Sequence, residues 1–378
     1  MRNPRFLLLF IVLTVSAHAA DPASRQAVTV AQLEHMVSTT HIDDHNFARR
    51  LSGLELTERL NHDRRARLTA ALPGGQSRVA LTVLADLSQF LDPPASEIVP
   101  ASPPDAAARV QIFNRAVAFV QSTMHSMPNF FATRDTSRFE SRSRLRDTGQ
   151  SILVQNTAFR PTDQAWVNVL YRDGTEVVEQ RVGQMRGSGL TSWGEFGPFL
   201  GVIAADILKG TVAFQHWELS SAGTLAVFDF MVPKEHSNYV VRFCCRLHYE
   251  MAQGTKADYR LQPAYHGRIA IDPPSGAILR LVVSADLQPE DAISRADVAI
   301  EYGPVDLGGK TYTCPLSSVA VSVAPAIGQA AATLSNPATP SGGLNDIGIT
   351  ALNHTVFEGY HLFRGDMRIV PDADPKQP

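Results

Sequence analysis

Hydrophobic residues recur every three or four positions through the first quarter of the chain, which is the period of an amphipathic helix. Leu33 and Val37 lie four residues apart, and the same spacing continues over 77–91. A Pro-Gly-Gly sequence at 73–75 ends one of these segments. The pattern predicts a compact unit of short helices over residues 29–92.

A proline-rich segment and then a longer helix follow. The prolines within 93–104 prevent a regular helix and predict a stiff, extended linker, which we take as a domain boundary. Asp105 is a favourable N-cap for a helix that ends before Pro128. The apolar stripe of this helix consists of Val110, Phe113, Val117, Val120 and Met124.

From about Ser137 onwards the apolar residues alternate with polar ones, which is the period of a half-buried strand. Asp173-Gly174 is a strong signal for a two-residue hairpin turn, because both positions favour positive φ. A second hairpin is expected over 266–284, around a Pro-Pro-Ser-Gly turn. Strands on such short connections predict an antiparallel sheet, with one helix over 198–208 between them.

The first twenty residues differ in character from the rest. Arg2 and Arg5 precede an apolar run over 6–15, and small residues at signal-peptidase positions end at Ala19. The run is too short for a membrane span, and no later run approaches the ~20 apolar residues that a spanning helix needs. We expect a secretory signal peptide over 1–20, no transmembrane span after its removal, and a periplasmic or extracellular protein.

The chain is weakly acidic, with a formal net charge of −3 that becomes about −5 without the two arginines of the signal peptide. This balance gives no electrostatic case for binding nucleic acid, which needs a strongly basic face. A run of arginines between 134 and 146 could contact anionic material. A solvated face paired with acidic residues is the more common reason for such a run.

Cysteines occur at 244, 245 and 314. An oxidising compartment permits a disulfide, and an odd count leaves one thiol over. The strand expected over 239–249 places Phe243 and Cys245 on its apolar face and Arg242 on its wet face. We expect a buried bridge between Cys245 and Cys314. The alternatives are a bridge to Cys314 from Cys244 in place of Cys245, and three free thiols.

No motif in the sequence identifies a reaction. His41 and His45 would share one face of a helix, but no third ligand follows at a recognisable metal-site spacing. Asp43 and Asp44 between them suit the start of a helix, so a helix start is the favoured interpretation. We expect no metal site and no cofactor.

Two His/Glu pairs are the candidates for acid–base chemistry. His216 and Glu218 would point the same way on a strand, and so would His248 and Glu250. Polar alternation on an exposed strand face explains both pairs as well. The chain has no Gly-x-Ser-x-Gly elbow and no phosphate-binding glycine motif, so no catalytic residue is assigned.

Two sets of residues carry a resemblance to known proteins. The stretch 265–272 with the Ser-Gly-Ala-Ile-Leu-Arg sequence at 275–280 resembles a hairpin of the periplasmic lipoprotein carriers, the LolA/LolB-like proteins and the related sigma-factor regulator sensors. A closer resemblance is to uncharacterised secreted bacterial proteins, which have no activity to transfer. It is carried by Val177, Gly194–Pro198, Val232–Lys234, Glu301–Val305 and Gly309–Pro315.

The carrier resemblance implies a strongly curved antiparallel sheet that holds acyl chains in its hollow. We therefore expect an α+β fold: the small helical N-terminal unit, the linker, and a domain over 105–370 in which a curved antiparallel sheet, a half-barrel, wraps the long helix. A loop over 325–345 is expected to be mobile, either as a lid or as a tolerated insertion. The hollow would be lined by Val110, Phe113, Val117, Phe243, Ile269, Ile271, Leu279 and Leu281.

Three hypotheses for function follow, and they belong to different classes. The leading one is an exported, non-catalytic envelope protein that binds lipid, lipoprotein or a partner protein in the concave face of the sheet. The second is a secreted hydrolase that uses the His/Glu pairs. The third is a structural interaction protein without a ligand cavity. The sequence leaves the oligomeric state open.

Overall fold

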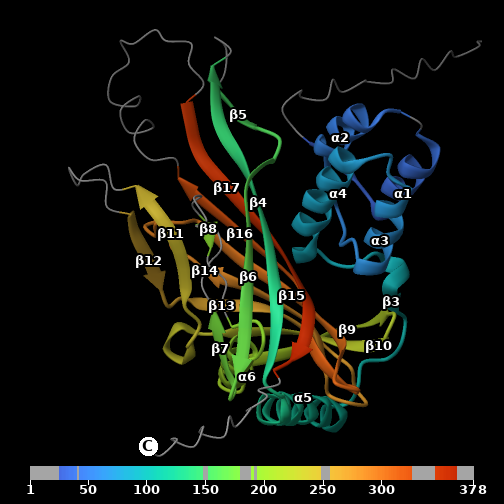
Figure 1. Cartoon of the computed structure of the whole chain (residues 1–378), viewed down its shortest axis with the longest axis vertical. Coiled ribbons are helices and arrows are strands. Elements are labelled where there is room, and N and C mark those ends of the chain that lie inside the picture. Colours follow the sequence, from blue (N-terminus) through green and yellow to red (C-terminus); the bar gives the residue numbers. More distant parts are fainter. Residues whose placement is uncertain are drawn as a thin grey trace, which may run out of the picture.

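The computed structural model describes residues 25–40, 42–147, 152–178, 189–190, 194–247, 256–325 and 345–363. The chain is mixed α/β, with a large antiparallel sheet and helices on both of its sides (Figure 1). The helices are α1 (Val30–Thr39), α2 (Asp44–Ser52), α3 (His62–Ala71), α4 (Gly75–Leu87), α5 (Ala106–Ser126) and α6 (Pro198–Ile207), with short 3₁₀ turns at Ser88–Phe90, Ala95–Glu97 and Lys234–His236.

The large sheet has 12 strands in the described part of the chain. Its order is β3-β9-β10-β13-β14-β15-β16-β17-β4-β6-β7, with β5 paired to β4, and it does not close into a barrel. The strands of this sheet are β3 (Ile98–Val99), β4 (Phe130–Asp147), β5 (Ile152–Asn156), β6 (Arg160–Arg172), β7 (Thr175–Val178), β9 (Thr211–Ser220), β10 (Gly223–Val232), β13 (Ala264–Ile271), β14 (Ile278–Asp286), β15 (Arg295–Leu307), β16 (Lys310–Pro325) and β17 (Asn345–Leu362).

Two smaller sheets accompany it. In the first, β1 (Gln26–Val28) pairs in parallel with β2 (Leu54–Leu56) inside the N-terminal unit. In the second, β11 (Val241–Leu247) lies between β12 (Lys256–Leu261) and β8 (Gly189–Leu190). The prediction of a mixed α/β chain built on an antiparallel sheet is confirmed.

The predicted hairpin turns have the expected backbone. Asp173 has φ of 52° and Gly174 has φ of 78°, so both central residues of the β6–β7 turn are left-handed. Gly308 and Gly309 are likewise left-handed between β15 and β16. Both predicted turns therefore connect neighbouring antiparallel strands.

The N-terminal unit has its own apolar core, which contains Leu33, Phe47 and Leu81 with the inward residues of β2. Asp43 caps α2 by accepting from the Asn46 amide at 3.0 Å. Asp44 accepts from the amides of Gln76 and Ser77 at 2.9 Å and so holds the start of α4. The interpretation of these two aspartates as helix-start residues is confirmed, while His41 lies outside the described residues.

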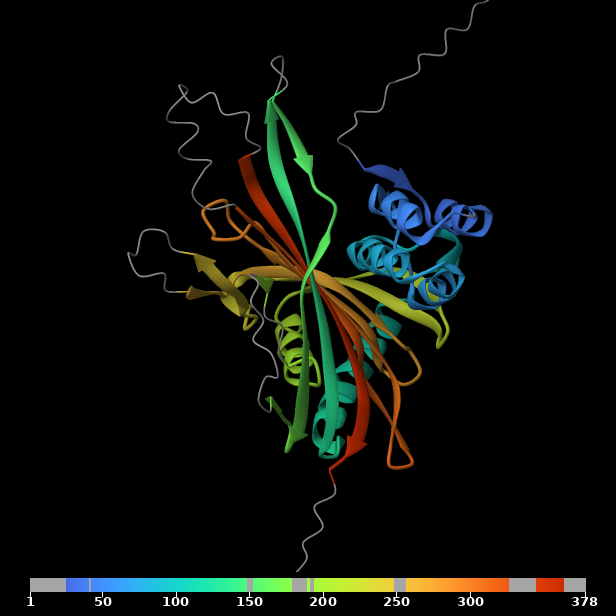
Figure 2. The same cartoon turned by 45° about the horizontal axis from the view of Figure 1, so that its top comes forward.

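The sheet is covered on both faces by different parts of the chain. On β16, Ala320 belongs to the core under α5 and α6, whereas its neighbours Val319 and Val321 pack in the cluster that includes Val83 of α4. Alternate residues of a strand point to opposite faces. The N-terminal unit therefore lies on the side of the sheet opposite α5 and α6, as Figure 2 shows.

The helix predicted to follow Asp105 is present as α5, and the Asp105 side chain accepts from the Ala108 amide at 2.7 Å. Its buried stripe, however, is Ile112, Ala116 and Val120, and Val110 is 58% exposed. Positions 110 and 112 lie about 200° apart around a helix, so both cannot face the sheet. The α5 backbone at Arg115 and Ala116 packs closely against Gly276 of the β13–β14 turn.

The predicted disulfide is not present, because Cys314 is a free, buried cysteine. Cys314 lies on β16 within an apolar cluster that includes Met127, Phe130 and Phe196. Strand β11, which carries Cys245, pairs with β12 and β8 in a separate sheet. Both cysteines were expected on apolar strand faces, but that shared character does not bring them together, because their strands belong to different sheets.

Some predictions fall on residues that the structure does not describe. These are the signal peptide over 1–20 and the loop predicted over 325–345, of which residues 326–344 are not described. Of the helices that the structure describes, none has the length and hydropathy that a membrane span requires.

Candidate functional site

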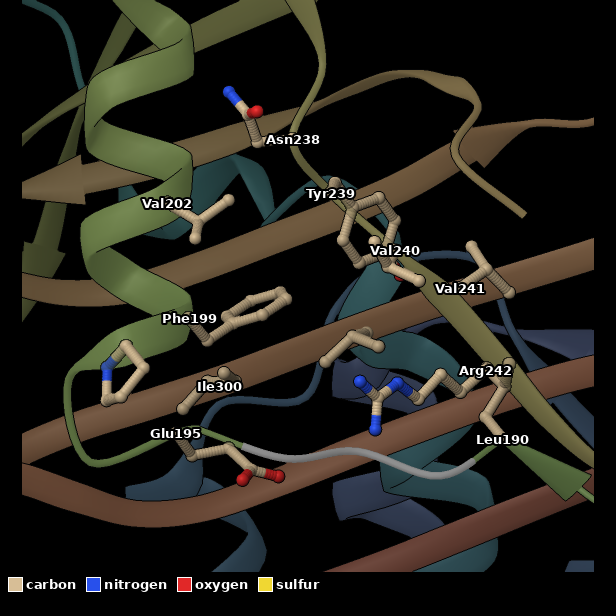
Figure 3. A pocket seen from close by; sticks show the side chains of 12 residues that line it. Leu190, Glu195, Phe199, Val202, Asn238, Tyr239, Val240, Val241, Arg242 and Ile300 are labelled. Atoms are coloured by element: carbon tan, nitrogen blue, oxygen red, sulfur yellow. The ribbon is translucent and has the colours of Figure 1, made fainter. Parts of the chain in front are cut away.

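A cavity of about 190 Å³ lies between α6 and the segment that leads into β11. Val298 and Ile300 of β15 line it, and Figure 3 shows Ile300 on the strand that passes behind the cavity. Most of the lining is apolar, which is typical of binding sites for small molecules. The residues that line it are Leu190, Glu195, Pro198, Phe199, Val202, Asn238, Tyr239, Val240, Val241, Arg242, Val298 and Ile300.

The wall on α6 follows from its local sequence. Gly194 has φ of 88°, and its carbonyl accepts from the amides of Gly197 and Phe199, which closes a tight turn before the helix. Pro198 then occupies the first turn, where its missing N–H costs nothing. Phe199 and Val202 are three residues apart, so they share one helix face, and Figure 3 shows both directed into the cavity.

A buried carboxylate fixes the far wall to this helix. Asp206 of α6 is 1% exposed and accepts from both the amide and the side chain of Asn238, each at 2.6 Å. The Tyr265 hydroxyl donates to the same carboxylate at 3.1 Å. The Phe199 and Tyr239 rings meet edge to face across the cavity, with centroids 5.8 Å apart. The cavity is therefore held open by hydrogen bonds and not by loop contacts alone.

Two buried glutamates lie beside one end of the cavity. Glu195, which lines it, forms an ion pair with Arg134 of β4, and Glu176 of β7 lies 3.5 Å from the same guanidinium. Burial raises the pKa of Glu176 to about 7; Arg134 opposes this rise and the charge of Glu195 adds to it. One arginine thus serves two carboxylates, and they do not both ionise readily.

This arrangement predicts a specific pH dependence of stability. The pKa of Glu176 is raised above its ordinary value of 4.5. Its contribution to the free energy of unfolding is therefore fully present below pH 4.5 and is lost as the pH rises through about 7. Glu176→Gln should remove this decline and raise the free energy of unfolding at pH 8 by about 1–3 kcal/mol. Denaturant unfolding between pH 5 and 8 measures it. Glu358→Gln, an exposed change on β17, is the control, and equal slopes for all three proteins would contradict the assignment.

The His216/Glu218 pair predicted as an acid–base candidate lies elsewhere, at the junction of the N-terminal unit and the sheet. Glu218 is 1% exposed and accepts two hydrogen bonds from Arg280, both at 2.7 Å, and one from Arg59 at 2.6 Å. His216 lies 3.4 Å from it. Burial alone would raise the pKa of Glu218, but these hydrogen bonds and positive charges hold it well below its usual range.

That ion-pair network joins the two parts of the chain. Arg59 comes from the N-terminal unit, while Glu218 and Arg280 stand on β9 and β14. Since both oxygens of Glu218 accept hydrogen bonds from arginines, the carboxylate links the N-terminal unit to the sheet. His248 and Glu250 lie outside the described residues. The described residues contain no group of three or more His, Cys, Asp or Glu placed to hold a metal ion.

None of the eight residues predicted to line the hollow lines this cavity. Four are buried in the core beneath α5 and α6, and Phe113 packs partly against that core. Val117 is half-buried, Val110 is exposed, and Leu279 packs with Val227 in a cluster on the opposite face. The four core residues are Phe243, Ile269, Ile271 and Leu281.

Sequence reasoning missed the cavity because its walls come from segments far apart in the chain. The helix over 198–208 and the alternation of Val241, Arg242 and Phe243 were both predictable. That these two segments lie side by side could not be predicted. A usable signal was Asp206, an acid in an otherwise apolar helix, because a buried carboxylate requires partners from another element.

Comparisons of the chain with protein-family models, with curated proteins and with solved structures found no match. The resemblance to the lipoprotein carriers and to secreted bacterial proteins therefore stays a prediction.

Proposed function

We propose that this is an exported, non-catalytic binding protein that holds a hydrocarbon segment in the cavity between α6 and residues 238–242. The observation that supports the proposal is the apolar lining of that cavity, to which Phe199, Val202 and Val241 contribute. A lining of this kind favours a ligand through the removal of apolar surface from water. Lipid and lipid-modified protein are the ligand classes that fit.

The size of the cavity limits what it can hold. At about 190 Å³ it is smaller than the ~300–1,000 Å³ typical of sites that enclose a whole drug-sized ligand. We therefore propose that one chain segment enters and that the rest of the ligand stays outside. In this proposal the large sheet acts as an open half-barrel, with α5 and α6 filling the hollow that the carriers keep for acyl chains.

Filling the cavity tests the proposal. Val202→Phe should weaken the binding of 1-decanol at least about tenfold, because the new ring occupies the space that the chain would use. Ala205→Phe is the matched control, since Ala205 is exposed on the same helix. Native mass spectrometry with thermal unfolding as a fold check measures the outcome. The proposal fails if the wild-type chain takes up no decanol, or if Val202→Phe binds it as wild type does.

A further inference from the structure

Arg242 is a charged residue at the edge of an apolar cavity. It stands on β11, it is exposed, and Figure 3 shows its guanidinium directed towards the middle of the cavity. Within the described part of the chain no hydrogen bond or ion pair engages that guanidinium. By contrast Arg134 and Arg280, which are largely buried, are each paired with carboxylates.

A second arginine lies directly across from it. In the β11–β12 pair, Arg242 is the register partner of Arg260, which is also exposed. Directly opposed residues of an antiparallel pair have Cβ atoms roughly 5 Å apart, and like charges at that spacing repel each other. The pair is therefore a local cost to folding that an anion between the two side chains would relieve.

The carboxylates nearby do not supply that anion. Glu195 lines the same cavity, but it is engaged by Arg134 and makes no ion pair with Arg242. The pKa of Glu176 is raised by burial, so this second carboxyl is partly protonated at neutral pH. Within the described residues, the positive charge of the arginine pair is therefore not balanced by these two acids.

We propose that the ligand of this cavity is an anionic amphiphile whose carboxylate or phosphate group binds Arg242 and Arg260 while its hydrocarbon segment enters beside Val202. The inference rests on the proposed function and adds the chemical class of the head group. A guanidinium presents paired N–H donors that match a carboxylate or a phosphate. The wall of α6 then takes the apolar part.

Three probes with hydrocarbon chains of equal length separate the contribution of head-group charge to binding from that of the hydrocarbon. Decanoate, 1-decanol and decylammonium share the same hydrocarbon, so only the head group differs. Wild type should bind decanoate about tenfold more tightly than decanol, and decylammonium more weakly than decanol. Isothermal titration measures the dissociation constants, with decyl phosphate as a second anionic probe. Acetate and inorganic phosphate, which lack the chain, should bind too weakly to be measured.

Variants then assign the effect to residues. Arg242→Gln should remove most of the preference for decanoate over decanol, and Arg260→Gln should reduce that preference about two- to fivefold. Both variants should bind decanol with the affinity of the wild type. Arg172→Gln removes one exposed charge that does not line the cavity and serves as the control. Equal affinity of the three probes for wild type, or an unchanged preference in Arg242→Gln, would overturn the head-group inference while leaving the cavity proposal standing. Failure of all probes to bind would instead overturn the proposed function.

Discussion

Glu218→Ala should lower the free energy of unfolding by about 3–5 kcal/mol, because it leaves the buried guanidiniums of Arg59 and Arg280 without their shared anion. Arg59 is 2% exposed, so water cannot replace the lost carboxylate without opening the junction between the N-terminal unit and the sheet. Denaturant unfolding at neutral pH measures the loss. We also expect faster proteolysis near residues 92–104, where the unit joins the sheet.

Asp229→Ala is the matched control, because Asp229 is 42% exposed in its ion pair with Arg268 and should cost less than about 1 kcal/mol. The wild-type chain should also lose stability in acid. The pKa of Glu218 is lowered, so its contribution is present above the ordinary glutamate value and disappears as pH falls below it. A Glu218→Ala protein as stable as Asp229→Ala would refute the role of the network.

Gly276→Ala should cost about 2–4 kcal/mol, the second largest effect that the structure predicts. Gly276 has φ of 78°, which disfavours any side chain, and a Cβ there would meet the Arg115 carbonyl oxygen of α5 at 2.5 Å. The substitution therefore strains the β13–β14 turn and pushes α5 off the sheet at the same time. Loss of the α5 contact should appear as accelerated amide exchange around Ala116.

Gly309→Ala separates the two causes. Gly309 has a similar φ of 85° in the β15–β16 turn, but nothing lies within 4 Å of its added Cβ. Its substitution should cost only the backbone term, about 1 kcal/mol. If the two variants are equally stable, the contact between the turn and α5 contributes nothing and the docking of that helix needs another explanation.

The elements that were predicted correctly are those whose signals are local. Asp173-Gly174 fixes its hairpin because both residues tolerate positive φ, and Asp105 starts α5 because its side chain caps the first turn. Asp43 starts α2 in the same way. Each of these structures depends on three or four consecutive residues, so sequence alone was sufficient.

The layers could not be predicted in the same way. Cys245 and Cys314 both looked inward-facing, yet they belong to strands of different sheets. Val110 matched the helical period, but the stripe of α5 that is buried consists of Ile112, Ala116 and Val120. Periodicity predicts that one face of a helix or strand is buried. Only the tertiary arrangement decides which other element packs against that face.

The candidate site shows the same division. The charged side chains at its end, Glu195 and Arg242, come from a turn and a strand about fifty residues apart in the chain. The function of Glu218 as a link was hidden for a similar reason, since its partner Arg59 lies 159 residues away. Constellations assembled across layers carry no spacing that a motif search can recognise.

Photoaffinity labelling tests the central claim, that the cavity beside α6 holds a hydrocarbon chain. A 1-decanol analogue with a diazirine near the end of its chain would be irradiated with the wild-type protein, and labelled peptides mapped by mass spectrometry. We expect labels within 198–202 and 238–242, and their loss when unmodified decanol competes. Labels confined to other segments, or no labels that decanol can displace, would contradict it.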